Sequence, residues 1–188
     1  MNLLSRQNVG TVFLIYYFTF GVKYDILFIY VKIMVVLMDN LIFETDAFSP
    51  DVTSKAGAKL ANEVLNNSSF PRFIALRGDL GAGKTEFTRG FASVASPGSF
   101  VKSPTYALVN EYKKGAIPLF HFDIYRLSDE DDLYSTGYFD YLDRGICLVE
   151  WFQNIPECLP EEYFEVVIDK INDGEARHIS VYLRKRGQ

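Results

Sequence analysis

Cysteine and histidine are scarce in this sequence, with two of each among its 188 residues. Cys147 and Cys158 lie eleven positions apart, a spacing that fits neither a CxxC redox motif nor a zinc-binding pair. His121 and His178 are far apart in sequence and cannot by themselves form a metal cage. We therefore expect two reduced thiols, as in a cytoplasmic protein, and no zinc site.

Basic residues are also fewer than acidic ones. The chain has 19 Lys and Arg against 24 Asp and Glu, a net charge of −5. Residues 1–37 contain three basic residues and one acid, so the remainder of the chain has a net charge of −7. Such an acidic chain is a poor candidate for binding nucleic acid over its whole surface. One basic cluster, Arg184-Lys185-Arg186, is expected to be a solvated tail.

The N-terminal part lacks an uncharged apolar run long enough to cross a membrane. Residues 1–38 are dense in Phe, Tyr, Ile, Leu and Val, but the run Thr11–Val22 ends at Lys23. A second run, Ile26–Met38, contains Lys32. A membrane-spanning helix needs about 18 uncharged residues, and no small-residue cleavage site of a signal peptide follows the apolar stretch.

Three interpretations of residues 1–38 stay open. The segment is an extension outside the working domain, for example an over-extended start with initiation at Met34 or Met38. Alternatively, it associates with a membrane, or it is a functional element. The working domain is expected to occupy residues 39–188, with no membrane contact of its own.

Strand and helix patterns alternate after residue 38. Strand patterns occupy Leu41–Thr45, Phe73–Leu76, Tyr106–Tyr112, Ile117–Asp123, Ile146–Val149, Phe164–Ile171 and Ala176–Leu183. Helix patterns run from Ser49-Pro50 to about Asn66, over Lys84–Val94, and through a short acidic helix capped by Ser128. The last two strands flank Asn172-Asp173-Gly174, a hairpin signal. This order predicts a three-layer α/β/α domain whose mixed, mostly parallel sheet carries an antiparallel C-terminal hairpin.

One motif indicates the chemistry. Residues 78–85 read GDLGAGKT and fit the phosphate-loop pattern G-x-x-x-x-G-K-[ST] at every fixed position. In such a loop the backbone N–H groups and the following helix N-terminus attract phosphate oxygens. Lys84 is expected to reach the β- and γ-phosphates of ATP, and the Thr85 hydroxyl to ligate Mg²⁺. The motif predicts a P-loop NTPase fold whose phosphate binders are Gly78, Asp79, Leu80, Gly81, Ala82, Gly83, Lys84 and Thr85.

A P-loop also needs a carboxylate near the magnesium ion. Glu150 and Asp123 each follow an apolar strand pattern, and either residue is otherwise an ordinary strand-end acid. We assign Glu150 to the metal, because its strand is the more buried, and Asp123 to the attacking water. Thr105 is a candidate sensor of the γ-phosphate, the alternative being a turn before a strand. For Trp151 a packing role is the default.

Five blocks in order make the chain resemble a known family. They are GDLGAGKT (Gly78–Thr85), TRGFA (Thr88–Ala92), SPTY (Ser103–Tyr106), HFDIYRL (His121–Leu127) and VEW (Val149–Trp151). They are similar to those of the TsaE (YjeE) family, the P-loop ATPases of bacterial tRNA threonylcarbamoyladenosine synthesis. The resemblance covers residues from about Leu41 to Leu183. The chain departs from the family pattern at Glu86, where a second threonine is common, and in its N-terminal extension.

The resemblance implies a function and partners. It implies a monomer that hydrolyses ATP slowly and works with a glycoprotease-fold transferase and the inactive paralogue of that transferase. Together these proteins place a threonylcarbamoyl group on adenosine 37 of tRNA. The resemblance therefore implies that this protein contacts tRNA through the complex. The family pattern matches Thr85 and Glu150 to the magnesium ligands and Asp123 to a catalytic or nucleotide-contacting acid. It matches further nucleotide contacts to Leu80–Thr85, Thr53 and Arg177.

Three other functions remain as alternatives. A small-molecule kinase would need an arginine-rich lid, but only Arg126 and Arg144 lie between the P-loop helix and the final hairpin. A GTPase would be expected to carry an N-K-x-D run, which this sequence lacks. A non-catalytic nucleotide-binding module would keep the P-loop but tolerate loss of Asp123 and Glu150.

Overall fold

A computed structural model describes residues 40–187 of the chain. The three interpretations of residues 1–38 lie outside this described part. Within it, no helix is both long and apolar enough to cross a membrane. Cys147 and Cys158 are both free, and burial raises the pKa of the Cys147 thiol to about 12.

Helices and strands alternate along residues 40–187. The strands are β1 (Leu41–Ala47), β2 (Phe73–Arg77), β3 (Val109–Tyr112), β4 (Leu119–Asp123), β5 (Ile146–Glu150), β6 (Glu162–Ile171) and β7 (Ala176–Lys185). The α-helices are α3 (Pro50–Asn66), α4 (Lys84–Ala95), α5 (Glu130–Ser135) and α6 (Phe139–Leu142). Short 3₁₀ turns are η1 (Phe152–Asn154), η2 (Pro156–Cys158) and η3 (Asn172–Gly174).

All these strands join one sheet, in the order β1-β7-β6-β2-β5-β4-β3. The central strands β6, β2, β5 and β4 are parallel, whereas β7 and β3 run the opposite way. Strand β1 pairs antiparallel with β7 and so shares the direction of the central strands. The mixed α/β sheet and its antiparallel C-terminal hairpin are therefore confirmed.

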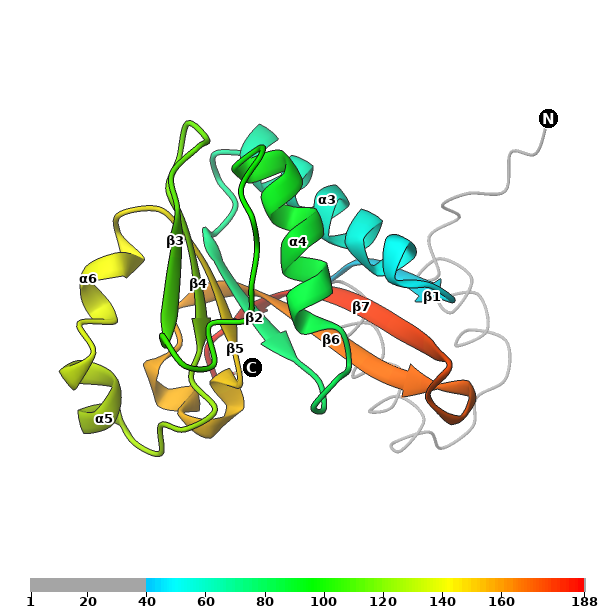
Figure 1. Cartoon of the computed structure of the whole chain (residues 1–188). Helices are drawn as coiled ribbons and strands as arrows, with labels where there is room; N and C mark the ends of the chain where they lie inside the picture. Colours follow the sequence, from blue (N-terminus) through cyan, green and yellow to red (C-terminus); the bar gives the residue numbers. More distant parts are fainter. Residues whose placement is uncertain (1–39, 188) are drawn as a thin grey trace, which may run out of the picture. The chain divides into compact units, whose positions relative to one another are not determined.

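Two hydrophobic cores lie on opposite faces of the sheet, because successive side chains of a strand point to opposite faces. In β2, Ile74 and Leu76 belong to the core beneath α3 and α4. Phe73 and Ala75 belong to the other core, which also holds Leu133 of α5. Helices α3 and α4 run side by side over one face, while α5 and α6 lie apart from them (Figure 1). The sheet is thus the middle of three layers, as the sequence predicts.

Helices α3 and α4 approach each other closely at a glycine. A Cβ atom at Gly90 of α4 would overlap the carbonyl oxygen of Ser54 in α3. Helix α3 begins with Ser49 in an extended conformation and Pro50 at the first helical position, as predicted, although the Ser49 side chain makes no capping hydrogen bond. The tight α3–α4 contact fixes helix α4, and its N-terminus follows the P-loop directly.

Two local predictions are wrong. Asp129, not Ser128, caps α5, since its side chain accepts a hydrogen bond from the N–H of Asp132. Strand β3 begins at Val109, three residues later than predicted. The delay arises because Leu108 adopts a positive φ of 66° and donates its N–H to the carbonyl of Pro104 at 2.7 Å, which makes a turn of the preceding residues.

Candidate functional site

The P-loop, Gly78–Thr85, connects the end of β2 to the start of α4. Gly83, the residue before α4, has a φ of 113°, a conformation that favours glycine because it has no Cβ. Lys84 and Thr85 form the first turn of α4, where the N–H groups of a helix have no partner within the helix. The loop therefore offers backbone donors and the positive end of a helix to an anion.

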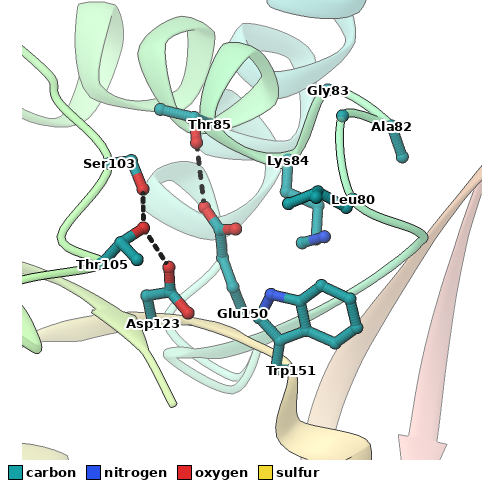
Figure 2. Close-up of a pocket in the computed structure, with 11 residues that line it drawn as sticks. Leu80, Ala82, Gly83, Lys84, Thr85, Ser103, Thr105, Asp123, Glu150 and Trp151 are labelled. Atoms are coloured by element: carbon teal, nitrogen blue, oxygen red, sulfur yellow. Dashed lines mark hydrogen bonds between the residues drawn. The ribbon is translucent and has the colours of Figure 1, made fainter. Parts of the chain in front are cut away.

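A cavity of about 250 Å³ opens beside this loop. Its lining comes from the P-loop, from the segment before β3, and from the ends of β4 and β5 (Figure 2). The lining residues are Leu80, Gly81, Ala82, Gly83, Lys84, Thr85, Ser103, Thr105, Asp123, Glu150 and Trp151. The cavity brings together the predicted phosphate binders from Leu80 onward, both predicted acids and the predicted γ-phosphate sensor.

Lys84 is buried in this cavity. Its Nζ donates to the carbonyl oxygens of Gly78 at 2.7 Å and Asp79 at 3.1 Å. The same ammonium lies 4.1 Å from the ring centroid of Trp151, within the range of a cation–π interaction. Burial lowers the pKa of Lys84 despite the opposing effect of the Glu150 and Asp123 carboxylates. An anionic ligand in the cavity would offset that desolvation.

Thr85 and Glu150 meet across the cavity. The Thr85 hydroxyl donates to Oε1 of Glu150 at 3.2 Å (Figure 2). Both side chains offer oxygen atoms, the ligand type that Mg²⁺ prefers, so the two residues would be able to hold the ion together. In residues 40–187 no group of three or more His, Cys, Asp or Glu side chains could hold a metal. A hydroxyl and a carboxylate are the kind of oxygen ligands that Mg²⁺ takes from a protein when phosphate and water supply the others.

His121 supports Glu150 from inside the fold. It is fully buried on β4, and its Nε2 lies 2.9 Å from Oε1 of Glu150. Because an ionised carboxylate only accepts, Nε2 carries the proton of this bond. Among the buried side-chain nitrogen and oxygen atoms of residues 40–187, Nδ1 of His121 is the one without a hydrogen-bond partner. Sequence analysis excluded a metal cage of His121 and His178 and quoted His121 in the HFDIYRL block, but it did not predict this contact.

Asp123 lies beside Glu150, since the two acids are register partners at the ends of the parallel strands β4 and β5. Thr105 donates its hydroxyl to Oδ2 of Asp123 at 2.7 Å. The hydroxyl of Ser103 lies 2.7 Å from that of Thr105 and so is left to donate to it. The backbone N–H of Tyr125 donates to Oδ1 at 3.2 Å. These bonds fix the orientation of the Asp123 carboxylate, which lines the cavity.

The other predicted nucleotide contacts do not line the cavity. Gly78 and Asp79 use their carbonyl oxygens to bind Lys84. Thr53, buried in α3, has its methyl group 3.6 Å from the position of a Cβ at Gly83.

Arg177, another of these residues, lies on β7 and donates to the carbonyl oxygens of Gly81 and Ala82. Glu86, where the chain departs from the family pattern, forms an ion pair with Arg89 one turn along α4.

Trp151 packs against the core that contains Phe73 and Ala75, as sequence analysis expected, but it also borders the site. It follows β5 with a positive φ of 67° and lines the cavity. Its ring also contacts the ring of Tyr125 at 4.9 Å between centroids. A left-handed residue directly after a strand-end acid is not visible in a sequence, because tryptophan seldom adopts that conformation.

Comparisons with known proteins indicate the family of this chain. A family model described as threonylcarbamoyl adenosine biosynthesis protein TsaE matches residues 48–179. The tRNA threonylcarbamoyladenosine biosynthesis protein TsaE of Bacillus subtilis is 47% identical over 103 residues, which are 54% of this chain and 64% of that protein. The protein of the same name from Aquifex aeolicus is 36% identical over 128 residues, which are 66% of this chain and 86% of that protein.

The fold also has a counterpart among solved structures. The crystal structure of Bacillus subtilis YdiB matches with a TM-score of 0.58 and 34% sequence identity, covering 77% of this chain and 86% of that chain. The range matched by the family model, residues 48–179, spans the P-loop, Asp123 and Glu150 of this chain. Family model, relatives and fold therefore agree that this chain belongs to the TsaE family.

Proposed function

We propose that this protein binds ATP with Mg²⁺, hydrolyses it slowly, and through that cycle supports the formation of threonylcarbamoyladenosine in tRNA. The observation that carries the proposal is the convergence of three elements on one cavity. The P-loop brings backbone donors, Lys84 and Thr85, and the neighbouring strand ends bring Asp123 and Glu150. A phosphate loop facing two strand-end carboxylates is the arrangement used by P-loop hydrolases.

The phosphate end of the nucleotide is expected to lie against the P-loop. Backbone N–H groups at the start of α4 would bind the phosphate oxygens. Lys84 would leave the carbonyls of Gly78 and Asp79 and extend to the β- and γ-phosphates, gaining stronger charge-assisted hydrogen bonds. The ring of Trp151 would then border the ammonium on one side. In the structure its centroid lies 4.1 Å from Nζ of Lys84.

Thr85 and Glu150 would hold the magnesium ion. When bound, Mg²⁺ would neutralise charge on the β- and γ-phosphates. His121 donates to Glu150 from the interior and so keeps the carboxylate in one orientation. This bond restricts the side chain before the metal arrives, which lowers the entropic cost of binding.

Asp123 would act on the attacking water. Its Oδ2 accepts from Thr105 and its Oδ1 from the N–H of Tyr125, so the carboxylate is oriented and still able to accept a proton from water. Thr105 lines the same cavity and is the candidate sensor of the γ-phosphate. Its release from Asp123 on nucleotide binding would change the segment before β3, as in other nucleotide switches.

The output of the cycle is proposed to be a change of shape passed to partners. The TsaE family membership supports a role in tRNA threonylcarbamoyladenosine synthesis. Here the partners would be the glycoprotease-fold transferase and its inactive paralogue, with adenosine 37 of tRNA as the modified base. The net charge of −7 on residues 38–188 favours contact with tRNA through the complex, not by the isolated monomer. Such a role places the protein in the cytoplasm.

Two assays test this function. The first measures turnover of the full chain with ATP, GTP and a panel of nucleosides as phosphate acceptors. Slow ATP hydrolysis without acceptor is expected, whereas efficient phosphate transfer to a nucleoside would make the protein a kinase. ATP binding without any turnover would make it a non-catalytic module.

The second assay measures modified tRNA formed over many cycles by the purified partners, with and without this protein. We expect synthesis to stop after the first cycles when the protein is left out. Unchanged multi-turnover synthesis in its absence would contradict the proposed role.

A further inference from the structure

Every carbonyl of the first part of the P-loop binds a cationic side chain. Among the five carbonyls of Gly78–Ala82, Lys84 binds the first two. Lys170 donates to the third, that of Leu80, at 2.8 Å. Arg177 binds the last two, through Nη2 at 3.2 Å and Nε at 2.7 Å. The loop is therefore held from the cavity by one cation and from the C-terminal hairpin by two.

The two hairpin cations form a pair of their own. Lys170 and Arg177 are opposite each other in the antiparallel register of β6 and β7, where like charges are normally destabilising. Here both cations face carbonyl dipoles of the P-loop, which offset the repulsion. Arg177 is also anchored within the hairpin, since its Nη1 donates to the carbonyls of Gly174 and Ala176 at 2.8 Å each.

Neither hairpin cation lines the cavity. Lys170 and Arg177 are absent from the residues that line the cavity, and their hydrogen bonds reach the loop carbonyls instead. A phosphate-binding loop needs its N–H groups pointing at the anion, so the carbonyls that Lys170 and Arg177 bind have to point away. Turning one of these peptides over would break a hydrogen bond to a charged donor, which is worth about twice a neutral one.

We propose that Lys170 and Arg177 are positioning residues that hold the P-loop in its phosphate-binding conformation before any ligand arrives. This inference rests on the proposed function, because it presumes that the loop binds phosphate. Holding the loop ready raises the fraction of molecules competent to bind, and apparent affinity rises in proportion. Arg177 then contributes through the loop backbone and not by contact with the base or ribose.

Hydrogen exchange on the full chain without nucleotide tests directly whether Lys170 and Arg177 hold the P-loop. We expect Arg177→Ala and Lys170→Ala each to speed exchange of the amides in residues 80–85 by about tenfold or more, since local opening governs exchange. Lys185→Ala is the matched control, because Lys185 is a cation of β7 paired with Glu162 at 3.1 Å. It is expected to leave the exchange of the loop unchanged.

Arg177→Lys separates geometry from charge. It keeps the positive charge but presents one nitrogen in place of the two that bind successive carbonyls. We expect it to share the faster exchange of Arg177→Ala. Loop exchange equal to wild type in all three variants would overturn the proposal, as would wild-type exchange in Arg177→Lys alone. If Arg177→Ala fails to fold, Lys170→Ala, with its single exposed bond to the loop, carries the same test.

Ligand binding gives the second readout. We expect Arg177→Ala to weaken binding of ATP and of inorganic tripolyphosphate by the same factor, about tenfold. Loss of ATP affinity with unchanged tripolyphosphate affinity would show a contact with base or ribose and overturn the inference. If the wild-type chain bound neither ligand, the proposed function would fail. The exchange experiment would still decide whether Lys170 and Arg177 hold the P-loop.

Discussion

The hydroxyl of Thr85 donates to Oε1 of Glu150 at 3.2 Å, although the two residues are 65 positions apart in the chain. The contact exists because β2 and β5 are parallel neighbours in the sheet. The P-loop leaves the end of one strand, and Glu150 stands at the end of the other. This pair is where the proposed magnesium ion would bridge the loop to the sheet.

Glu150→Gln is expected to weaken nucleotide binding mainly when Mg²⁺ is present. A neutral amide is a poorer ligand for this hard cation, so we expect the gain in ATP affinity on adding Mg²⁺ to fall by about tenfold or more. Calorimetric titration with Mg²⁺ and with EDTA measures both affinities on the same variant. Equal losses in the two conditions would move the metal role to Asp123.

Asp123→Asn is expected to slow hydrolysis while preserving ATP binding. The amide oxygen can keep the hydrogen bond from the N–H of Tyr125 while the NH2 group donates to the Thr105 hydroxyl, but the amide cannot take a proton from water. We expect kcat to fall by about 10²–10⁴-fold with ATP affinity within a few-fold of wild type. Single-turnover kinetics at saturating ATP would check this. A lost affinity with unchanged kcat would make Asp123 a nucleotide contact and not a base.

His121→Leu is expected to lower the apparent affinity for Mg²⁺ in the ATP complex by about tenfold, the usual cost of losing an outer partner of a metal ligand. His121→Gln places an amide nitrogen near the position of Nε2 and should restore most of that loss. Magnesium-free ADP binding serves as the control, because it does not involve Glu150. Identical Mg²⁺ dependence in wild type and His121→Leu would exclude the positioning role.

Gly90→Ala is expected to destabilise the domain. The added methyl would collide with the Ser54 carbonyl of α3, so the two helices would have to separate, at a cost of about 1–3 kcal/mol or more. Glu63→Ala, at an exposed position of the facing helix α3, should change the free energy of unfolding by only about 0.5 kcal/mol. Urea denaturation followed by circular dichroism compares the two variants. Similar midpoints would show that the helix contact is looser than described.

The parts of the fold that could be predicted from sequence are those with a local cause. The apolar run Ile146–Val149 predicts a buried strand, which is β5, and Asn172-Asp173-Gly174 predicts the turn between β6 and β7, where Asn172 and Asp173 have positive φ. The start of β3 could not be predicted, because it depends on the unusual φ of Leu108. Such a conformation is imposed by the surrounding structure and leaves no pattern in the sequence.

The candidate site divides in the same way. Lys84, Thr85 and the strand-end acids follow from a motif and from strand endings, and the cavity contains all of them. His121 was missed, although it stands two positions before Asp123 in a strand that is otherwise apolar. A polar residue at that spacing shares a strand face with the acid, and this was the available signal. The position of Arg177 depends on how the hairpin packs against the loop, which no local pattern reveals.

The central claim is that the P-loop binds and hydrolyses ATP with Mg²⁺, and turnover of the Lys84→Ala variant tests it most directly. The experiment measures phosphate release from Mg-ATP by the full wild-type chain and by the variant, with circular dichroism showing that both are folded. We predict slow, magnesium-dependent release by wild type and its loss in Lys84→Ala, because the variant has no cation at the β- and γ-phosphates. Turnover at the wild-type rate in a folded Lys84→Ala protein would contradict the account.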